Sequence, residues 1–263
     1  MKLLKMNTIT KNKYFSFQRF MLLLKKEAQF NVKRDLLIVG AMFSLFTLVM
    51  TLVFEFDEGN YDSEMLENLH FIAFTVMLFV GGVFISSFSF MELRDKLKSH
   101  FYLLTPGSNF EKFLGNLLIS LVAYILFMIV TYLTYSWIFN WIVFKLYGLQ
   151  FSPLNLISEE FLIAINVFVL VHSISFLGSI TFKKYPVIFT PIAGFILLTV
   201  VSLFNELMEK IVFAKMDLDK HLSNIDFEDF FGQYENLFKF ILFYVIPIIL
   251  WITTYLKLNE KEY

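Results

Sequence analysis

Cysteine is missing from this sequence, so neither disulfides nor thiolate metal sites can form, and the redox compartment is left open. Charge is scarce as well. Asp, Glu, Lys and Arg make up 17% of the 263 residues, against about 25% in a typical soluble protein. Hydrophobic residues make up 57%, with 35 Phe among them. The composition therefore predicts an integral membrane protein.

The short motifs of common catalytic and nucleotide-binding sites are missing too. The sequence contains no G-x-x-x-x-G-K-[ST], H-E-x-x-H, G-x-S-x-G or G-x-G-x-x-G. The pair Glu159-Glu160 resembles the paired glutamates of CAAX-type membrane proteases, but the arginine that completes that motif is absent. The histidines lack a local metal-ligand spacing: His70, His100, His172 and His221. We therefore expect no catalytic residue, no metal site and no cofactor bound by this chain itself.

The sequence contains long runs of uncharged, mostly apolar residues. A membrane-spanning helix needs about 20 mostly apolar residues. Six segments meet this requirement: Leu36–Phe54, Leu69–Phe90, Phe113–Trp137, Phe161–Phe182, Tyr185–Asn205 and Phe240–Leu256. We therefore predict an all-α, polytopic membrane protein with six transmembrane helices, forming a transmembrane domain over 36–256.

Lys and Arg are distributed unevenly over the connections between these segments. Nine of them precede the first segment, whereas the next connection has none and carries six acidic residues. Basic-rich and basic-poor connections then alternate, and basic connections tend to remain cytoplasmic. We therefore predict that 1–35, the connection 91–112 and the tail 257–263 are cytoplasmic. The connection 206–237 is predicted to be extracytoplasmic and helical, because it is long and mixes apolar and acidic residues.

The N-terminal segment contains a basic amphipathic pattern. Phe17, Phe20, Met21, Leu24 and Ala28 recur at helical spacing, while basic residues lie mainly on other faces. This pattern predicts an amphipathic interfacial helix on the inner membrane surface, in contact with membrane lipid.

Polar residues are sparse within the predicted spans. His172 is followed by Ser175 and Ser179 at i+3 and i+7, on one face of the fourth span. An intramembrane histidine is a candidate functional residue, whereas a histidine beside serines also suits a hydrogen bond between helices. Both interpretations stay open at this point.

The clearest local signal is the stretch YLLTPGSNFEKFLGNLL, which begins at Tyr102. Pro106 and Gly107 break the chain. Ser108 can then act as an N-cap, with Glu111 three residues later to complete a capping box. This predicts a helix that starts at the cytoplasmic surface and runs into the third span. The signal alone also suits a simple cap where the chain re-enters the membrane.

These features together resemble the permease subunits of ATP-binding-cassette exporters of the type-2 permease class. The resemblance covers nearly the whole chain, and the family's coupling pattern matches Leu103, Leu104, Pro106, Ser108, Glu111 and Lys112. It implies that this segment docks on a separate ATPase subunit, which binds the ATP. It also implies a second permease subunit, identical or different, and export across a bacterial plasma (inner) membrane.

Two other functions are compatible with the sequence. The chain can be a non-transporting membrane scaffold, or a membrane-embedded enzyme acting on lipid or peptide. The enzyme is disfavoured because few polar residues converge in the spans. No residue identifies a transported substrate, and we expect no nucleic-acid partner.

Overall fold

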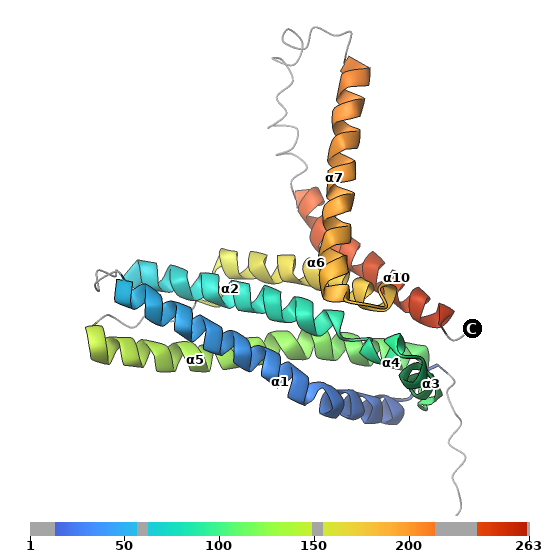
Figure 1. The fold of residues 1–263 in the computed structure, drawn as a ribbon, viewed down its shortest axis with the longest axis horizontal. Helices are drawn as coiled ribbons and strands as arrows, with labels where there is room; N and C mark the ends of the chain where they lie inside the picture. The colour runs from blue at the N-terminus through green and yellow to red at the C-terminus, as the bar shows by residue number, and fades with distance from the viewer. Residues whose placement is uncertain (1–13, 57–62, 149–154, 214–235, 262–263) are drawn as a thin grey trace, which may run out of the picture.

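The computed structural model describes residues 14–56, 63–148, 155–213 and 236–261, and every regular element within them is helical (Figure 1). The long helices are α1 (Phe17–Phe56), α2 (Ser63–Ser87), α5 (Tyr124–Tyr147), α6 (Glu159–Thr181), α7 (Pro186–Phe213) and α10 (Ile246–Glu260). Shorter elements are the 3-10 helix η1 (Met91–Arg94), α3 (Lys96–Leu104), α4 (Asn109–Leu117) and the π-helical turns η2 (Leu118–Ala123) and η4 (Ile241–Val245). The described residues thus confirm the predicted helical fold class.

Within the described residues, five helical segments are long and apolar enough to cross a membrane, as expected of a multi-pass membrane protein. They are Asn31–Leu52, Leu66–Ser87, Asn109–Leu146, Glu159–Thr181 and Asn236–Glu260. The predicted fifth span, Tyr185–Asn205, falls on α7, where Pro186–Ile196 forms a shorter apolar stretch. The sixth span and the cytoplasmic termini stay predictions.

Several helix boundaries differ from the predicted ones. The predicted interfacial helix and the first span form one continuous 40-residue helix, α1, because no Gly or Pro interrupts the sequence between Phe17 and Gly40. The third span begins earlier, at Asn109, and α10 continues into the predicted tail as far as Glu260. The predicted connection 206–237 begins as a continuation of α7, and its residues 214–235 lie outside the described part of the chain.

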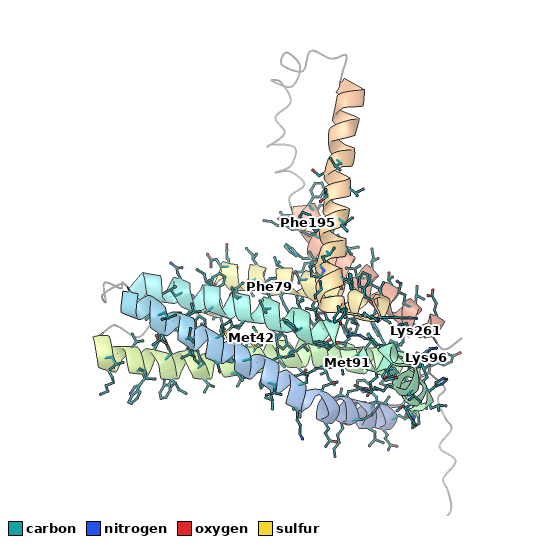
Figure 2. The ribbon with its side chains drawn as sticks, in the orientation of Figure 1. Met42, Phe79, Met91, Lys96, Phe195 and Lys261 are labelled. Atoms are coloured by element: carbon teal, nitrogen blue, oxygen red, sulfur yellow. The ribbon has the colours of Figure 1, made fainter. Side chains whose placement is uncertain are left out.

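Helix α2 is the centre of the helical bundle. It packs against α1, α5 and α6, and these four helices run side by side in Figure 1. Helix α10 packs along α6 at an oblique angle, and α7 leaves the end of α6 and projects away from the bundle. The side chain of Phe195 on α7, labelled in Figure 2, is 72% exposed.

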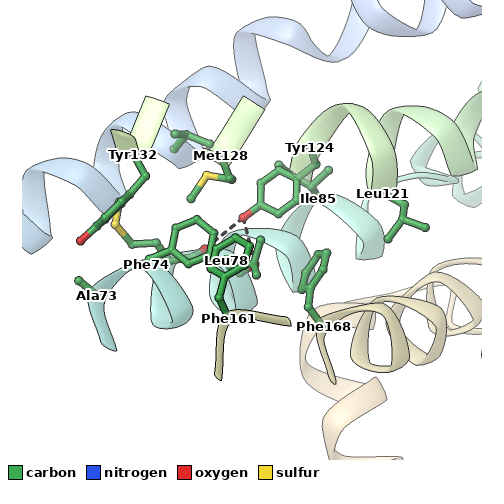
Figure 3. Packing of buried hydrophobic residues seen from close by; sticks show 12 residues of the cluster. Ala73, Phe74, Leu78, Ile85, Leu121, Tyr124, Met128, Tyr132, Phe161 and Phe168 are labelled. Carbon is green, nitrogen blue, oxygen red and sulfur yellow. Dashed lines mark hydrogen bonds between the residues drawn. The ribbon is translucent and has the colours of Figure 1, made fainter. Parts of the chain in front are cut away.

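The main core lies where α2 meets α5 and α6 (Figure 3). Phe74 of α2 packs against the Tyr132 and Phe161 rings, with centroids 5.3 Å away in each case. Tyr124 directs its hydroxyl into α2, donating to the carbonyl oxygens of Met77 and Leu78 at 3.1 Å each. This satisfies the phenol inside an otherwise apolar core.

Gly82 lets two aromatic rings reach the backbone of α2. A Cβ atom at this position would collide with the ring of Phe168 and lie 3.1 Å from Tyr124 Cε1. Rings held in a packed core cannot move aside easily, so Gly82→Ala should overpack the core and destabilise the protein by about 1–3 kcal/mol. Gly40→Ala is the matched control, because nothing lies within 4 Å of the place that its added methyl group would take. Unfolding of both variants in one detergent checks this, and equal stabilities would contradict it.

Candidate functional site

The connection after α2 folds into two short helices joined by a tight turn. Asp95 caps the first of them, α3, by accepting a hydrogen bond from the Leu97 amide at 2.9 Å. The end of α3 is closed by Thr105, whose amide donates to the Phe101 carbonyl at 3.1 Å. Pro106 and Gly107 then turn the chain into α4, as the sequence predicts.

The predicted capping box at the start of α4 is confirmed. The Glu111 amide donates to Ser108 Oγ at 3.2 Å, and the Ser108 amide donates to Glu111 Oε2 at 2.9 Å. Two amides that would otherwise lack a partner at the helix start are therefore satisfied by side chains.

Glu111 also binds the beginning of α1, which the sequence did not reveal. Arg19 donates from Nη2 to Glu111 Oε1 at 2.8 Å and from Nε to Oε2 at 3.0 Å. The amide of Ser16, just before α1, donates to Oε1 at 2.6 Å. In return, Ser108 Oγ donates to the Tyr14 carbonyl at 2.6 Å. The starts of α1 and α4 are thus joined through one buried carboxylate.

Lys112 ties α4 to the end of α3. Its Nζ donates to the Leu103 carbonyl at 3.0 Å and lies 5.4 Å from the centre of the Tyr102 ring. The carbonyls at a helix C-terminus lack partners within the helix, so a cation is well placed there. Asn116 adds a hydrogen bond to the Tyr102 hydroxyl at 3.1 Å. The two short helices are therefore held at a fixed relative position.

Helix α10 closes the same region from the other side. Asn109 Nδ2 donates to Asn259 Oδ1 at 3.0 Å. The Tyr255 ring lies edge-on to Phe110 and Phe113, with centroids 6.0 and 5.6 Å away. The capped start of α4 is therefore the point where α1, α3 and α10 meet, and we call this region the corner.

The packed face of α1 differs from the predicted apolar stripe. Phe20, Leu23 and Glu27 are the buried residues near its start, whereas Phe17 and Met21 are exposed. The difference arises because α4 covers one side of α1, a contact that helical periodicity cannot indicate. The exposed apolar residues remain available to membrane lipid.

One face of α3 is apolar and exposed. Leu97, Phe101 and Leu104 follow each other at i, i+4 and i+7, and each is 72–79% exposed. Of the predicted coupling residues, Leu104 belongs to this face, Pro106 is also exposed, and Leu103 is partly buried against the neighbouring hydrophobic cluster. Leu97 and Phe101 were not among the predicted coupling residues, although their helical spacing to Leu104 indicates a shared face.

Breaking the Arg19–Glu111 pair should loosen the corner locally. Arg19→Gln or Glu111→Gln leaves a buried polar group poorly paired, so amides of residues 16–23 and 107–112 should exchange hydrogen faster. The double variant should add little to either single one, because both remove the same interaction. Hydrogen exchange with mass spectrometry measures this.

Asp35→Asn provides the control for that experiment. It removes an ion pair confined to α1, in which Arg34 Nη2 lies 2.8 Å from Asp35 Oδ1. Exchange near residue 111 should therefore stay as in the wild type. Additive effects of the Arg19 and Glu111 variants would contradict a shared interaction.

A second charged group lies beside the corner, between α1 and η1. Lys26 Nζ is 4.0 Å from Glu27 Oε1 and 3.6 Å from Glu92 Oε2, so one cation serves two acids. Glu27 is only 6% exposed. Burial, followed by the charge of Glu92, raises the pKa of Glu27 to about 7, against opposing effects of Lys26 and Arg34. Asn31 donates weakly to the same carboxylate at 3.5 Å.

The raised pKa of Glu27 predicts a pH-dependent stability. The folded protein keeps this proton up to about pH 7, whereas the unfolded chain loses it near pH 4.5. The folded state binds more protons between these values, so its free energy of unfolding falls as pH rises from 4.5 to 7. Glu27→Gln should remove this loss and be more stable than wild type by about 2–3 kcal/mol above pH 7.

Thermal unfolding of wild type and Glu27→Gln between about pH 5 and pH 8.5 tests this shift. Glu160→Gln, at an exposed position at the far end of α6, should follow the wild type throughout. Parallel stability curves for wild type and Glu27→Gln would rule out the assigned proton.

His172 makes the predicted kind of contact between helices. Its Nε2 lies 2.9 Å from Ser120 Oγ of the π-helical turn η2. Within the described part of the chain, its Nδ1 has no hydrogen-bond partner. The predicted neighbours do not bind it: Ser179 donates to the Phe176 carbonyl at 2.6 Å, and Ser175 is buried on the same helix. A hydrogen bond between helices is therefore confirmed, whereas a functional role of His172 stays a prediction.

A second buried histidine was missed as a site. His70 Nδ1 lies 3.1 Å from the Tyr132 hydroxyl, and Nε2 lies 3.1 Å from Asn140 Oδ1. All three side chains are buried where α2 packs against α5. In the sequence, His70 stands out only as a polar residue at the start of a predicted span. The network satisfies every ring nitrogen, which is typical of a structural role.

Comparison of this chain with family models, curated proteins and solved structures finds no match. Among the described residues, no group of three or more His, Asp or Glu side chains is placed to hold a metal ion. The corner and its exposed surface are therefore the candidate functional site.

Proposed function

We propose that this chain is the membrane-spanning permease subunit of an ATP-driven export complex in a bacterial plasma membrane. In this proposal it has six transmembrane helices and cytoplasmic termini. It pairs with a second permease subunit and receives the movement of a separate ATPase subunit at the corner. The single observation that carries the proposal is the exposed apolar face of α3 on a firmly held helical corner.

The exposed face of α3 suits a protein partner. Leu97, Phe101 and Leu104 lie on a helix that also exposes Lys96 and Lys98. Apolar side chains flanked by charged ones are typical of a surface that another protein covers. The coupling segment in the family that the sequence resembles lies at the same position, so the ATPase subunit is the partner that we assign.

The corner has the mechanical properties that coupling needs. A push on α3 reaches α4 through Lys112 and Tyr102, α1 through Glu111, and α10 through Asn109. Helix α4 continues through η2 into α5, so a displacement of the corner is passed directly to a membrane-spanning helix. Force from a motor can move spans only through elements that do not bend first.

The proposal is tested by purifying the tagged chain from its native membrane. A co-purifying protein with a P-loop, and ATP hydrolysis by the purified complex, support the proposal. Phe101→Asp and Leu104→Asp should reduce the bound ATPase more than tenfold, because an apolar anchor at a protein interface is often worth about 2 kcal/mol or more.

Leu146→Asp is the matched control, because Leu146 is 70% exposed at the opposite end of α5. It should retain the wild-type amount of ATPase. Full ATPase binding by the Phe101 and Leu104 variants would remove the docking role of α3. A chain that purifies without any ATPase would instead favour the non-transporting scaffold.

A further inference from the structure

A cluster of four basic side chains lies beside the end of α6. Arg94 comes from η1, Lys183 from the turn after α6, and Lys257 and Lys261 from α10 and its C-terminal end; we call them the basic cluster. Figure 2 shows Lys261 at the same end of the molecule as Met91 of η1. Lys257 Nζ donates to Thr181 Oγ1 at 3.2 Å, and Lys261 Nζ donates to the Ile180 carbonyl at 2.8 Å. Three separate parts of the chain thus direct positive charge to one place.

The charge of the basic cluster is not neutralised by the described part of the protein. None of the four residues takes part in an ion pair with another described residue. Burial, and then the charges of Lys183, Lys257 and Arg94, lower the pKa of Lys261. The four cations therefore repel one another, and a bound anion would relieve this repulsion.

Hydrogen-bond donors are also left over in the basic cluster. Each ammonium group has three N–H donors, and the structure gives one protein acceptor to each of Lys257 and Lys261. Arg94 donates to the Ser87 carbonyl, but its Nε and the neighbouring Ser87 Oγ have no partner among the described residues. Donors of this kind suit a ligand with several oxygen acceptors, such as a phosphate group.

The basic cluster lies at the level where membrane-spanning helices end. The candidate spans Leu66–Ser87, Glu159–Thr181 and Asn236–Glu260 all finish beside it. Tyr185, two residues after Lys183, is exposed at the same level, and tyrosine is enriched among lipid headgroups. A phosphate at this depth belongs to the headgroup layer of the membrane.

From these observations we infer that the basic cluster is a binding site for the phosphate headgroup of an anionic phospholipid. The lipid comes from the leaflet at the corner end of the bundle, which the positive-inside distribution assigns to the cytoplasm. Its acyl chains lie along the apolar surface of the spans that end here. This site does not depend on the proposed ATPase partner.

A purely structural role of the lysines explains only part of the arrangement. Cations at a helix C-terminus satisfy its free carbonyls, which accounts for Lys261, whose Nζ donates to the Ile180 carbonyl at the end of α6. Arg94 likewise donates to the carbonyl of Ser87, the last residue of α2. This role does not account for Lys257, which donates to a hydroxyl, or for Lys183, which is exposed and adds repulsion. An anionic lipid accounts for all four.

The test is a titration of the purified protein with phosphatidylglycerol or phosphatidylcholine of identical acyl chains, with native mass spectrometry counting bound lipids. Wild type should prefer phosphatidylglycerol. Lys183→Gln should weaken phosphatidylglycerol binding about fivefold, because this is the usual contribution of one basic residue at an anionic surface. The double variant Lys257→Gln with Lys261→Gln should weaken it about 25-fold. Lys183→Gln keeps both hydrogen bonds to α6, so it remains informative if the double variant fails to fold.

Lys25→Gln with Lys145→Gln is the matched control, because it removes the same charge from exposed positions on α1 and at the opposite end of α5. It should bind phosphatidylglycerol as the wild type does. Equal loss in the control, or no preference between the two lipids, would overturn the site. Displacement of the lipid by millimolar inorganic phosphate would show a site for soluble anions and overturn the assignment to lipid.

Discussion

The corner depends on one buried carboxylate. Glu111 accepts hydrogen bonds from the amides of Ser108 and Ser16 and from the guanidinium of Arg19. A carboxylate removed from water is stable only when its charge and lone pairs are fully compensated. All these donors must therefore be in place together, and they come from the starts of two different helices. This requirement fixes α1 against α4, and the other contacts of the corner are built on that arrangement.

Rigidity at the corner contrasts with the irregular helical turn that follows it. Helix α4 is held at its first turn by Glu111 and at its side by Lys112, but it passes into the π-helical turn η2 before α5 begins. Such turns are often found at functional positions in helices. Ser120 of η2 is hydrogen bonded to His172 of α6 at 2.9 Å. A displacement of the corner thus passes through an irregular turn at which two spans are joined by a polar contact.

Local features of the corner could be predicted from the sequence, and distant ones could not. The capping box needs only Ser108 and Glu111, three residues apart, so its signal is complete in the sequence. Arg19 lies 92 residues from Glu111, and no periodicity connects them; the same holds for Ser120 and His172. The apolar face of α3 was missed for another reason. The prediction relied on the adjacent pair Leu103 and Leu104 as coupling residues. In the structure Leu103 packs inward, and the exposed face consists of Leu97, Phe101 and Leu104.

At the corner end of the molecule, ion-paired charges and cations without an ion-pair partner lie in different places. At the corner, Glu111 is paired with Arg19, and Lys26 lies between Glu27 and Glu92, so each of these two cations faces an acid. Between α6 and α10, by contrast, cations gather without an ion-pair partner among the described residues. Buried charge has to be compensated inside the protein, whereas charge at a membrane surface can be compensated by lipid. The apolar face of α3 and the basic cluster therefore suit different partners. Helix α4 contacts both α3 and α10, so a change at either surface can reach the other through it.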